Sequence, residues 1–362
     1  MAVQLSKLWD DAAEMDSTLR LPRGRRSALT EKLVQPETYS RVRLFSQISR
    51  GHVCIFRDLT LPVSTLTGPP TADDLRRIIK EGFKPGQKAR VQVGRSRMHL
   101  ELAVGEVLRR WSAGGGIVSV TDLHFRGTGF GDAVDTSVIS DFNVLCNDRA
   151  HAPELMRKIE IMTLVISTRG NVTDSHTDDC DGSNHSFIGT KLWLAWDRVE
   201  GQRAGLQDDT RDPVVGQAAF DMGTFLSLPS SRWFLVRAGE TLFLPGSLAH
   251  KVVTLENYIG VGSFNVTLPG ALPTLTRWKL HGTTDVDRKN LSGKITEALT
   301  RRVLELRDAP RAAQAAWGLP VLRRSARSWD REMDDKTKEV LLADPLFAAF
   351  LAAAAAAMSH GA

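Results

Sequence analysis

Short apolar runs separated by turn-forming residues dominate the middle of the chain. From about Gly116 these runs are GIVSV, DFNVL, KIEIMTLVIST, KLWLAWD, RWFLVRA, TLFLP and YIGVGSFNVTL. Gly, Asp, Asn and Pro dominate the gaps between the runs. Many short strands with such punctuation predict a β-sandwich or β-barrel.

Helical patterns flank this β region on both sides. Before Arg50 the pattern predicts short helices, and GHVCIFRDL from Gly51 predicts a first strand. Thr71 is expected to cap a helix through Lys80. ARVQV then predicts a strand and MHLELAVGEVLRRW a helix that ends at the glycines 114–116.

Beyond Pro269 the apolar spacing is helical again, because KITEALTRRVLELR repeats its apolar residues at helical intervals. Gly318 and Pro320 interrupt this region before a final helix that includes Phe347. We therefore predict a mainly β core with α extensions. Residues 1–110 form an N-terminal mixed helical segment packed on the core, 111–275 the β core, and 276–362 a C-terminal helical region.

Composition predicts a soluble globular protein without membrane contact. The 362 residues are 42% hydrophobic and 25% charged, and no apolar run approaches the roughly 20 residues of a membrane span. The three cysteines, an odd number, favour a reducing compartment. The N-terminus has no apolar signal core and carries early acidic residues, so we expect a cytoplasmic or nuclear protein.

The net charge of +5 is a mild excess of 47 basic over 42 acidic residues. Basic clusters lie at Arg20–Arg26 and Arg323–Arg327, and we interpret them first as solvated surface. Nucleic acid or an acidic partner is the lesser alternative, because no zinc-finger spacing or RNA-binding signature accompanies them.

The candidate chemistry lies in GNVTDSHTDDCDGSNHSFIGTK, which runs from Gly170 to Lys191. In an extended segment His176 and Asp178 project to the same face. His250, in LFLPGSLAHKVV, is the best candidate for a third ligand from a partner strand. Two imidazoles and one carboxylate are the ligand set of a non-haem Fe(II) oxygenase, which leaves open coordination positions.

Two further polar residues stand near these candidate ligands. The Lys191 ammonium is expected to pair with the distal carboxylate of a dicarboxylic co-substrate, and the Thr173 hydroxyl to donate to it. A charge pair at such a site contributes on the order of 4 kcal/mol. The alternatives are a strand-end lysine that reaches solvent and a threonine with an ordinary role in a turn.

Other residues of the run are expected to have structural roles. We expect Asp179, Asp181 and His185 to lie in a solvated loop, with a second metal site or substrate binding as the alternative. Trp193 and Trp196 are expected to fill the core.

These motifs resemble the core of the JmjC-type 2-oxoglutarate oxygenases, and the similarity is closest to the asparaginyl and protein hydroxylase branch. GNVTDSHTD followed by Lys191 is similar to the family's first metal segment. GETLFLPGSLAHKVV and YIGVGSFNV resemble the later segments. The family usually adds a tyrosine from an earlier strand, and the pattern assigns neither Tyr39 nor Tyr258 to that position.

The resemblance implies a double-stranded β-helix, the cupin-like jelly roll, flanked by N-terminal and C-terminal helices. It implies Fe(II) held by His176, Asp178 and His250. It also implies 2-oxoglutarate as co-substrate beside Lys191, Thr173 and Asn265, with O2 as oxidant. Helices after the barrel form dimers in the resembling branch, so a homodimer through the C-terminal helices is one expectation, and packing back onto the chain's own barrel is the other.

The leading functional hypothesis is a dioxygenase that hydroxylates an unactivated C–H bond on a protein or peptide side chain, with release of succinate and CO2. The alternative is a small-molecule oxygenase of the same mechanism, acting on a metabolite or natural product. A histone lysine demethylase and a non-catalytic cupin-type binding protein rank lower. The demethylase hypothesis is weakened because the sequence has no Cys-rich zinc modules. A non-catalytic protein would be free to lose metal ligands, whereas this sequence keeps all three.

Overall fold

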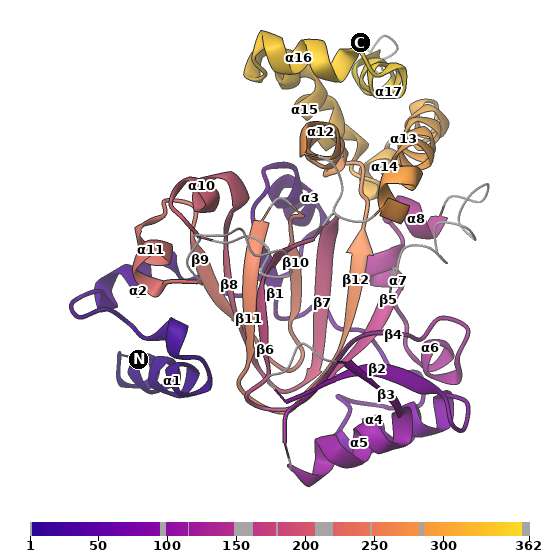
Figure 1. Cartoon of the computed structure of the whole chain (residues 1–362). Coiled ribbons are helices and arrows are strands. Elements are labelled where there is room, and N and C mark those ends of the chain that lie inside the picture. The colour runs from indigo at the N-terminus through magenta and orange to yellow at the C-terminus, as the bar shows by residue number, and fades with distance from the viewer. Residues whose placement is uncertain are drawn as a thin grey trace.

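The computed structural model describes residues 2–94, 99–114, 116–147, 162–178, 180–206, 220–246, 248–281 and 286–356. Two antiparallel sheets form its centre, and helices surround them (Figure 1). The chain is therefore a mixed α/β protein with a β core, as the pattern of short strands predicts.

The larger sheet has eight strands and the smaller has four. In order across the larger sheet, the strands are β1 (Cys54–Phe56), β10 (Thr241–Leu244), β7 (Asp181–Ile188), β12 (Tyr258–Asn265), β5 (Met162–Ser167), β4 (Val118–His124), β2 (Lys88–Val93) and β3 (His99–Ala103). The smaller sheet has the order β6 (Val172–Thr177), β11 (Leu248–Thr254), β8 (Lys191–Asp197) and β9 (Arg232–Val236).

A small apolar cluster fills the space between the two sheets. It draws residues from β1 and β10 of the larger sheet and from β8, β9 and β11 of the smaller one: Ile55, Trp193, Ala195, Phe234, Val236, Leu242, Leu244 and Val252. Side chains alternate along a strand, so Trp196 lies on the opposite face of β8 from Trp193. Both tryptophans are buried, which confirms their predicted core role.

The helices of residues 2–32 cover the outer face of the smaller sheet, where Trp9 and Leu19 join the same cluster as Trp196. The helix Arg41–Ser49 packs instead in the main core, through Leu44 and Phe45. The helices of this part of the chain are α1 (Ala2–Met15), η1 (Ser17–Leu19), α2 (Arg26–Lys32) and α3 (Arg41–Ser49). Two further helices, α10 (Arg198–Arg203) and α11 (Met222–Ser227), follow β8 along the chain.

The outer face of the larger sheet packs on α4 (Ala72–Gly82), α5 (Val104–Ala113), α6 (Gly129–Ala133), α7 (Ser137–Ser140) and α8 (Val144–Asn147). Thr71 caps α4 in a reciprocal capping box with Asp74, as the sequence predicts. The C-terminal helices gather beyond one end of the sheets (Figure 1). They are α12 (Ala271–His281), α13 (Val286–Arg307), α14 (Arg311–Ala316), α15 (Leu319–Glu332), α16 (Asp335–Leu342) and α17 (Pro345–Ala356).

Several predicted elements are wrong in type or extent. The helix expected from MHLELAVGEVLRRW is strand β3 followed by α5, because only the second half has a buried helical face. DFNVL is a turn leading into α8, where the Asn143 side chain accepts from Leu145 N instead of leaving the backbone to a strand ladder. The single final helix is two helices, α16 and α17, and Asp344 caps the second.

The loop expected around Asp181 and His185 is strand β7, buried between β10 and β12. Its polar composition misleads because Ser183, Asn184 and His185 find hydrogen-bonding partners on the neighbouring strands β12 and β10. The predictions made for Asp179 and for residues 158–161 lie outside the described residues, as does the end of the C-terminal helical region after residue 356.

Within the described ranges no single helix is long and apolar enough to cross a membrane. The pair α16 and α17 together reach the length and composition of a span, but they are bent by 107° at their break.

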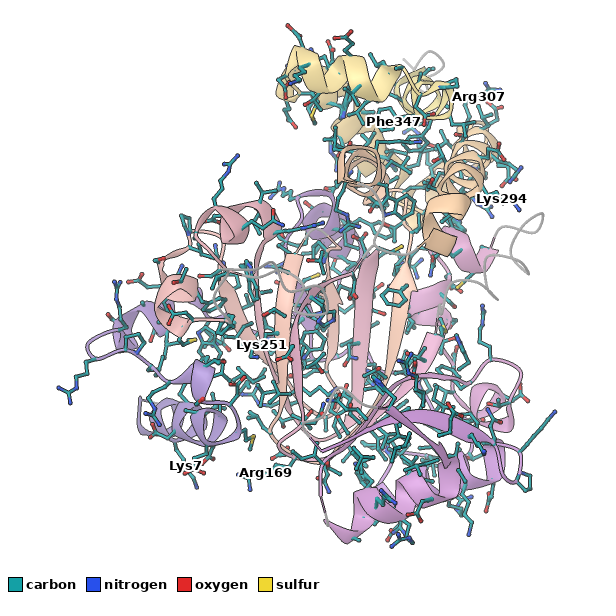
Figure 2. All side chains as sticks on the ribbon, viewed as in Figure 1. Lys7, Arg169, Lys251, Lys294, Arg307 and Phe347 are labelled. Carbon is teal, nitrogen blue, oxygen red and sulfur yellow. The ribbon has the colours of Figure 1, made fainter. Side chains whose placement is uncertain are left out.

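A buried ion pair ties the N-terminal segment to the smaller sheet. Lys251, on β11, lies on the side of this sheet that faces the N-terminal helices (Figure 2). Its ammonium is 2.8 Å from Asp16 Oδ2 and 3.3 Å from Asp174 Oδ1. Burial raises the pKa of Asp16, but the Lys251 charge and the hydrogen bonds from Lys251 and Thr18 together outweigh burial, so the pKa lies below its ordinary value.

The Lys251→Met variant is therefore expected to lose about 2–3 kcal/mol of unfolding free energy near neutral pH, because Asp16 is left without its partner. Urea denaturation measures the change, with the exposed Lys7→Met as the matched control. The loss should shrink as the pH falls below about 4, where the Asp16 carboxylate is protonated in the unfolded chain. An equal effect of both variants would contradict the structural role of the pair.

Candidate metal centre

Three candidate ligands come from two adjacent strands of the smaller sheet. His176 lies on β6 and His250 on β11, and the two residues are directly paired across the strands. Asp178 follows the last residue of β6. The register of this strand pair thus brings together residues that are far apart in the sequence.

The side chains of these residues converge on one point. Asp178 Oδ1 is 3.9 Å from His176 Nε2, and Asp178 Oδ2 is 3.7 Å from His250 Nε2. One ligand atom from each residue lies within 4.8 Å of the other two. The cluster can therefore hold a metal ion with two imidazoles and one carboxylate.

Backbone carbonyls orient both imidazoles. His176 Nδ1 is 2.8 Å from the carbonyl oxygen of Asp174, and His250 Nδ1 is 3.4 Å from that of Leu248. A proton on each Nδ1 leaves Nε2 as the free lone pair, which is the tautomer that a metal requires. Both Nε2 atoms are the ones that approach Asp178.

The site is closed on one side and open on the other. The His250 side chain is 3% exposed and stacks on Trp193, with ring centroids 5.5 Å apart. The His176 and Asp178 side chains are 21% and 25% exposed. A ligand can therefore reach the centre past His176 and Asp178, while Trp193 covers His250.

Lys191 lies farther along the same sheet, at the start of β8, and points between the two sheets. It is 4% exposed, and its Nζ lies 4.3 Å from the centroid of the Tyr258 ring on β12 of the opposite sheet. Burial lowers the pKa of Lys191 to about 7. Because Lys191 is buried, the alternative of a lysine that reaches solvent does not hold. In the part of the chain that the structure describes, no carboxylate forms an ion pair with it.

Tyr258 and Asn184 are polar residues of this interior that the sequence motifs did not assign. The Tyr258 hydroxyl donates to Asn184 Oδ1 and also contacts the carbonyl oxygen of His185, 3.3 Å away. The alternation in YIGVGSFNV is the signal that could have found Tyr258, because it puts Tyr258, Gly260 and Gly262 on one face of β12. The Tyr258 ring lies over Gly260, where a side chain would clash with its hydroxyl.

Thr173 and Asn265 occupy different surroundings. Thr173 pairs with Val252 on β11, near the level where Thr254 pairs with Lys191. Asn265 is buried at the far end of β12, and its Oδ1 accepts from Asn143 Nδ2 at 3.1 Å. Alternation along β12 puts Asn265 on the opposite face from Tyr258, so the structure does not bring it beside Lys191.

The buried polar residues of β7 have structural partners on neighbouring elements. His185 Nδ1 is 2.8 Å from Thr241 Oγ1, and burial lowers the pKa of this histidine to about 4. Asp181 Oδ1 accepts from Gly246 N at 3.2 Å, and burial raises the pKa of Asp181 to about 7. Within the described residues neither belongs to a second metal cluster.

Comparison with known proteins adds no family to these observations. No family model matches the chain, and no curated protein matches it either. The case for a function therefore rests on the geometry and on the motifs.

Proposed function

We propose that the two sheets form a double-stranded β-helix, the jelly roll of cupin-like proteins. The order of the strands supports this proposal. From β5 to β12 the chain alternates between the larger and the smaller sheet, except that β8 and β9 are both in the smaller one. Eight strands in two facing antiparallel sheets with this crossing pattern are typical of jelly rolls.

We further propose that the centre binds Fe(II) through His176, Asp178 and His250. The observation that carries the proposal is the convergence of two imidazoles and one carboxylate from paired strands. Three protein ligands on one side of the ion leave its other positions for a co-substrate and oxygen. The resemblance of the two ligand segments to JmjC-type oxygenases points to the same metal.

Lys191 supports 2-oxoglutarate as the co-substrate. It pairs with Thr254 on β11, and this level is about 13 Å along the strand from His250 at the usual rise per residue. A lysine side chain and a five-carbon dicarboxylate can share such a distance. A buried ammonium without a carboxylate partner is costly, and a bound anion would offset that cost.

The proposed activity is the hydroxylation of an unactivated C–H bond on a protein or peptide side chain. With Fe(II), 2-oxoglutarate and O2 bound, the centre supplies the oxidising power, and succinate and CO2 are released. The residues of the chain bind and orient the metal and the co-substrate. Lys191 fixes the distal carboxylate, Tyr258 borders it, and Trp193 shields the buried side of the metal from water.

The test is anaerobic addition of Fe(II) and 2-oxoglutarate to the chain, followed by exposure to O2. We expect a visible charge-transfer band and then oxygen-dependent succinate formation. The His176→Ala variant should show neither, whereas the exposed His52→Ala should behave as the wild type. If the wild-type chain gives no band and His176→Ala changes nothing, the oxygenase proposal fails.

Substrate class is tested with the same assay. Succinate formation stimulated by peptide or protein fractions supports a protein hydroxylase. Stimulation by metabolite fractions alone would overturn that version and favour the small-molecule oxygenase, and mass spectrometry of the modified species then identifies the substrate.

A further inference from the structure

An arginine from the C-terminal helical region reaches the segment that carries a candidate metal ligand. Arg277, on α12, is partly buried, and its Nη1 donates to the backbone carbonyl oxygen of Asp178 at 3.0 Å. This carbonyl belongs to the residue whose carboxylate faces both imidazoles. A charged donor makes such a hydrogen bond stronger than a neutral one.

The turn before β11 meets the same arginine. A Cβ atom on Gly246 would lie 2.9 Å from Arg277 Nη1 and 2.4 Å from the carbonyl oxygen of Cys180. The Cys180 backbone thus leaves no room for a side chain at residue 246, and the guanidinium packs against this bare turn. On its other side the Gly246 amide donates to Asp181 Oδ1 at 3.2 Å.

These contacts join the two chain segments that supply the ligands. Asp178 ends the segment of β6, and Gly246 opens the segment that leads to His250 on β11. Arg277 bonds to the first segment and packs against the turn of the second. It is thus placed to fix the distance and direction between Asp178 and His250.

The helix that carries Arg277 is itself firmly held. Leu275 and Trp278 of α12 are buried in the main core, and Lys279 forms an ion pair with Asp344, just before α17. Because α12 is anchored on both sides, the guanidinium has a fixed origin. The C-terminal helical region thereby contributes a contact to the metal centre.

We propose that Arg277 is a positioning residue, which holds the Asp178 segment in the geometry that binds the metal. The proposal rests on the proposed metal centre and names a residue of this chain outside its ligand set. Groups that orient metal ligands typically contribute 10–100-fold to metal affinity, so an effect of about 10-fold is expected here.

The experiment measures Co(II) binding by the apo chain, using the visible d–d spectrum to report both affinity and coordination geometry. Arg277→Ala should weaken binding about 10-fold and alter the spectrum. Arg277→Lys should restore part of the affinity, because a lysine can donate one hydrogen bond but lacks the planar fork.

Arg302→Ala is the matched control. Arg302 is also a helical arginine, and its Nη2 donates to the backbone carbonyl oxygen of Asn147 at 2.8 Å, away from the centre. This variant should lose thermal stability and keep the wild-type Co(II) affinity and spectrum. The comparison separates positioning from a general loss of stability.

The outcomes distinguish the two proposals. If the wild-type chain binds no Co(II), or if His176→Ala binds it equally well, the metal centre itself is wrong. If the wild-type chain binds Co(II) through His176 while Arg277→Ala keeps the same affinity and spectrum, the positioning role is overturned.

Discussion

The His250→Ala variant is expected to bind Co(II) or Fe(II) at least about 100-fold more weakly than the wild-type chain and to form no succinate. His250 is the only one of the three candidate ligands that is almost fully buried, and β11 delivers it opposite His176. Removing it leaves two ligands and an enlarged, wetter site. Isothermal titration of the apo chain with Co(II) measures the affinity.

His185→Ala is the matched control, because each histidine is 2% exposed and lies on a central strand. It loses the contact with Thr241 Oγ1 and the edge-to-face packing on Phe187. We expect a loss of about 2–4 kcal/mol in unfolding free energy, since a buried ring is replaced by a cavity. The folded fraction should still bind Co(II) normally.

The comparison has a clear contrary outcome. If His250→Ala retains metal affinity while it loses as much stability as His185→Ala, then His250 is a structural histidine and the centre is incomplete.

The Lys191→Met variant is expected to bind 2-oxoglutarate more weakly and, without ligand, to be more stable than the wild type. It should weaken 2-oxoglutarate binding by roughly 100- to 1000-fold, because an ion pair worth on the order of 4 kcal/mol is lost. It should also raise the unfolding free energy of the apo chain by about 2 kcal/mol near neutral pH, because an ammonium buried without a carboxylate partner is removed. Anaerobic titration and urea denaturation measure the two effects.

The stabilising effect has a defined pH dependence. The pKa of Lys191 is about 7 in the folded chain, against an ordinary value of 10.5. Between these values the unfolded chain holds a proton that the folded chain has released, so wild-type stability rises with pH across the window. The advantage of Lys191→Met should therefore be largest at pH 7 and below, and should disappear as the pH approaches 10.5.

The same titration affects ligand binding. Above pH 7 the free chain holds Lys191 increasingly neutral, so binding a carboxylate requires proton uptake and the affinity should fall. A wild-type affinity that does not change from pH 7 to about 9, together with an unaltered affinity in Lys191→Met, would exclude Lys191 as the carboxylate partner. An exposed lysine variant, Lys7→Met, should change neither quantity.

The sequence predicted the local features of the molecule well. Apolar residues at strand or helix spacing report the environment of a few neighbouring positions, which is why the strands around KLWLAWD and the helix capped by Thr71 were found. His176 and Asp178 share a face for the same local reason. Where a run was short or polar, as in DFNVL and β7, local spacing gave the wrong element because distant partners decided it.

Contacts that depend on strand register were harder to predict from the sequence. Tyr258 lies against Lys191 only because β12 and β8 belong to facing sheets, and no spacing in the chain reports that pairing. Asn265, at the other end of β12, contacts Asn143, which lies in the turn before α8 and is also distant in the sequence. A one-residue change of register would exchange the two faces, so a motif alone does not fix the direction of a side chain.

Local spacing along the chain thus specified the strands of the core, the His-x-Asp pair and the chemical type of the candidate site. Tertiary packing decided that His250 joins that pair, that Lys191 is buried beside Tyr258, and that Arg277 from a helix after the sheets reaches Asp178. The physical reason is range: periodicity is set by contacts within a few residues, whereas a binding site is assembled by strand pairing and helix packing between distant segments.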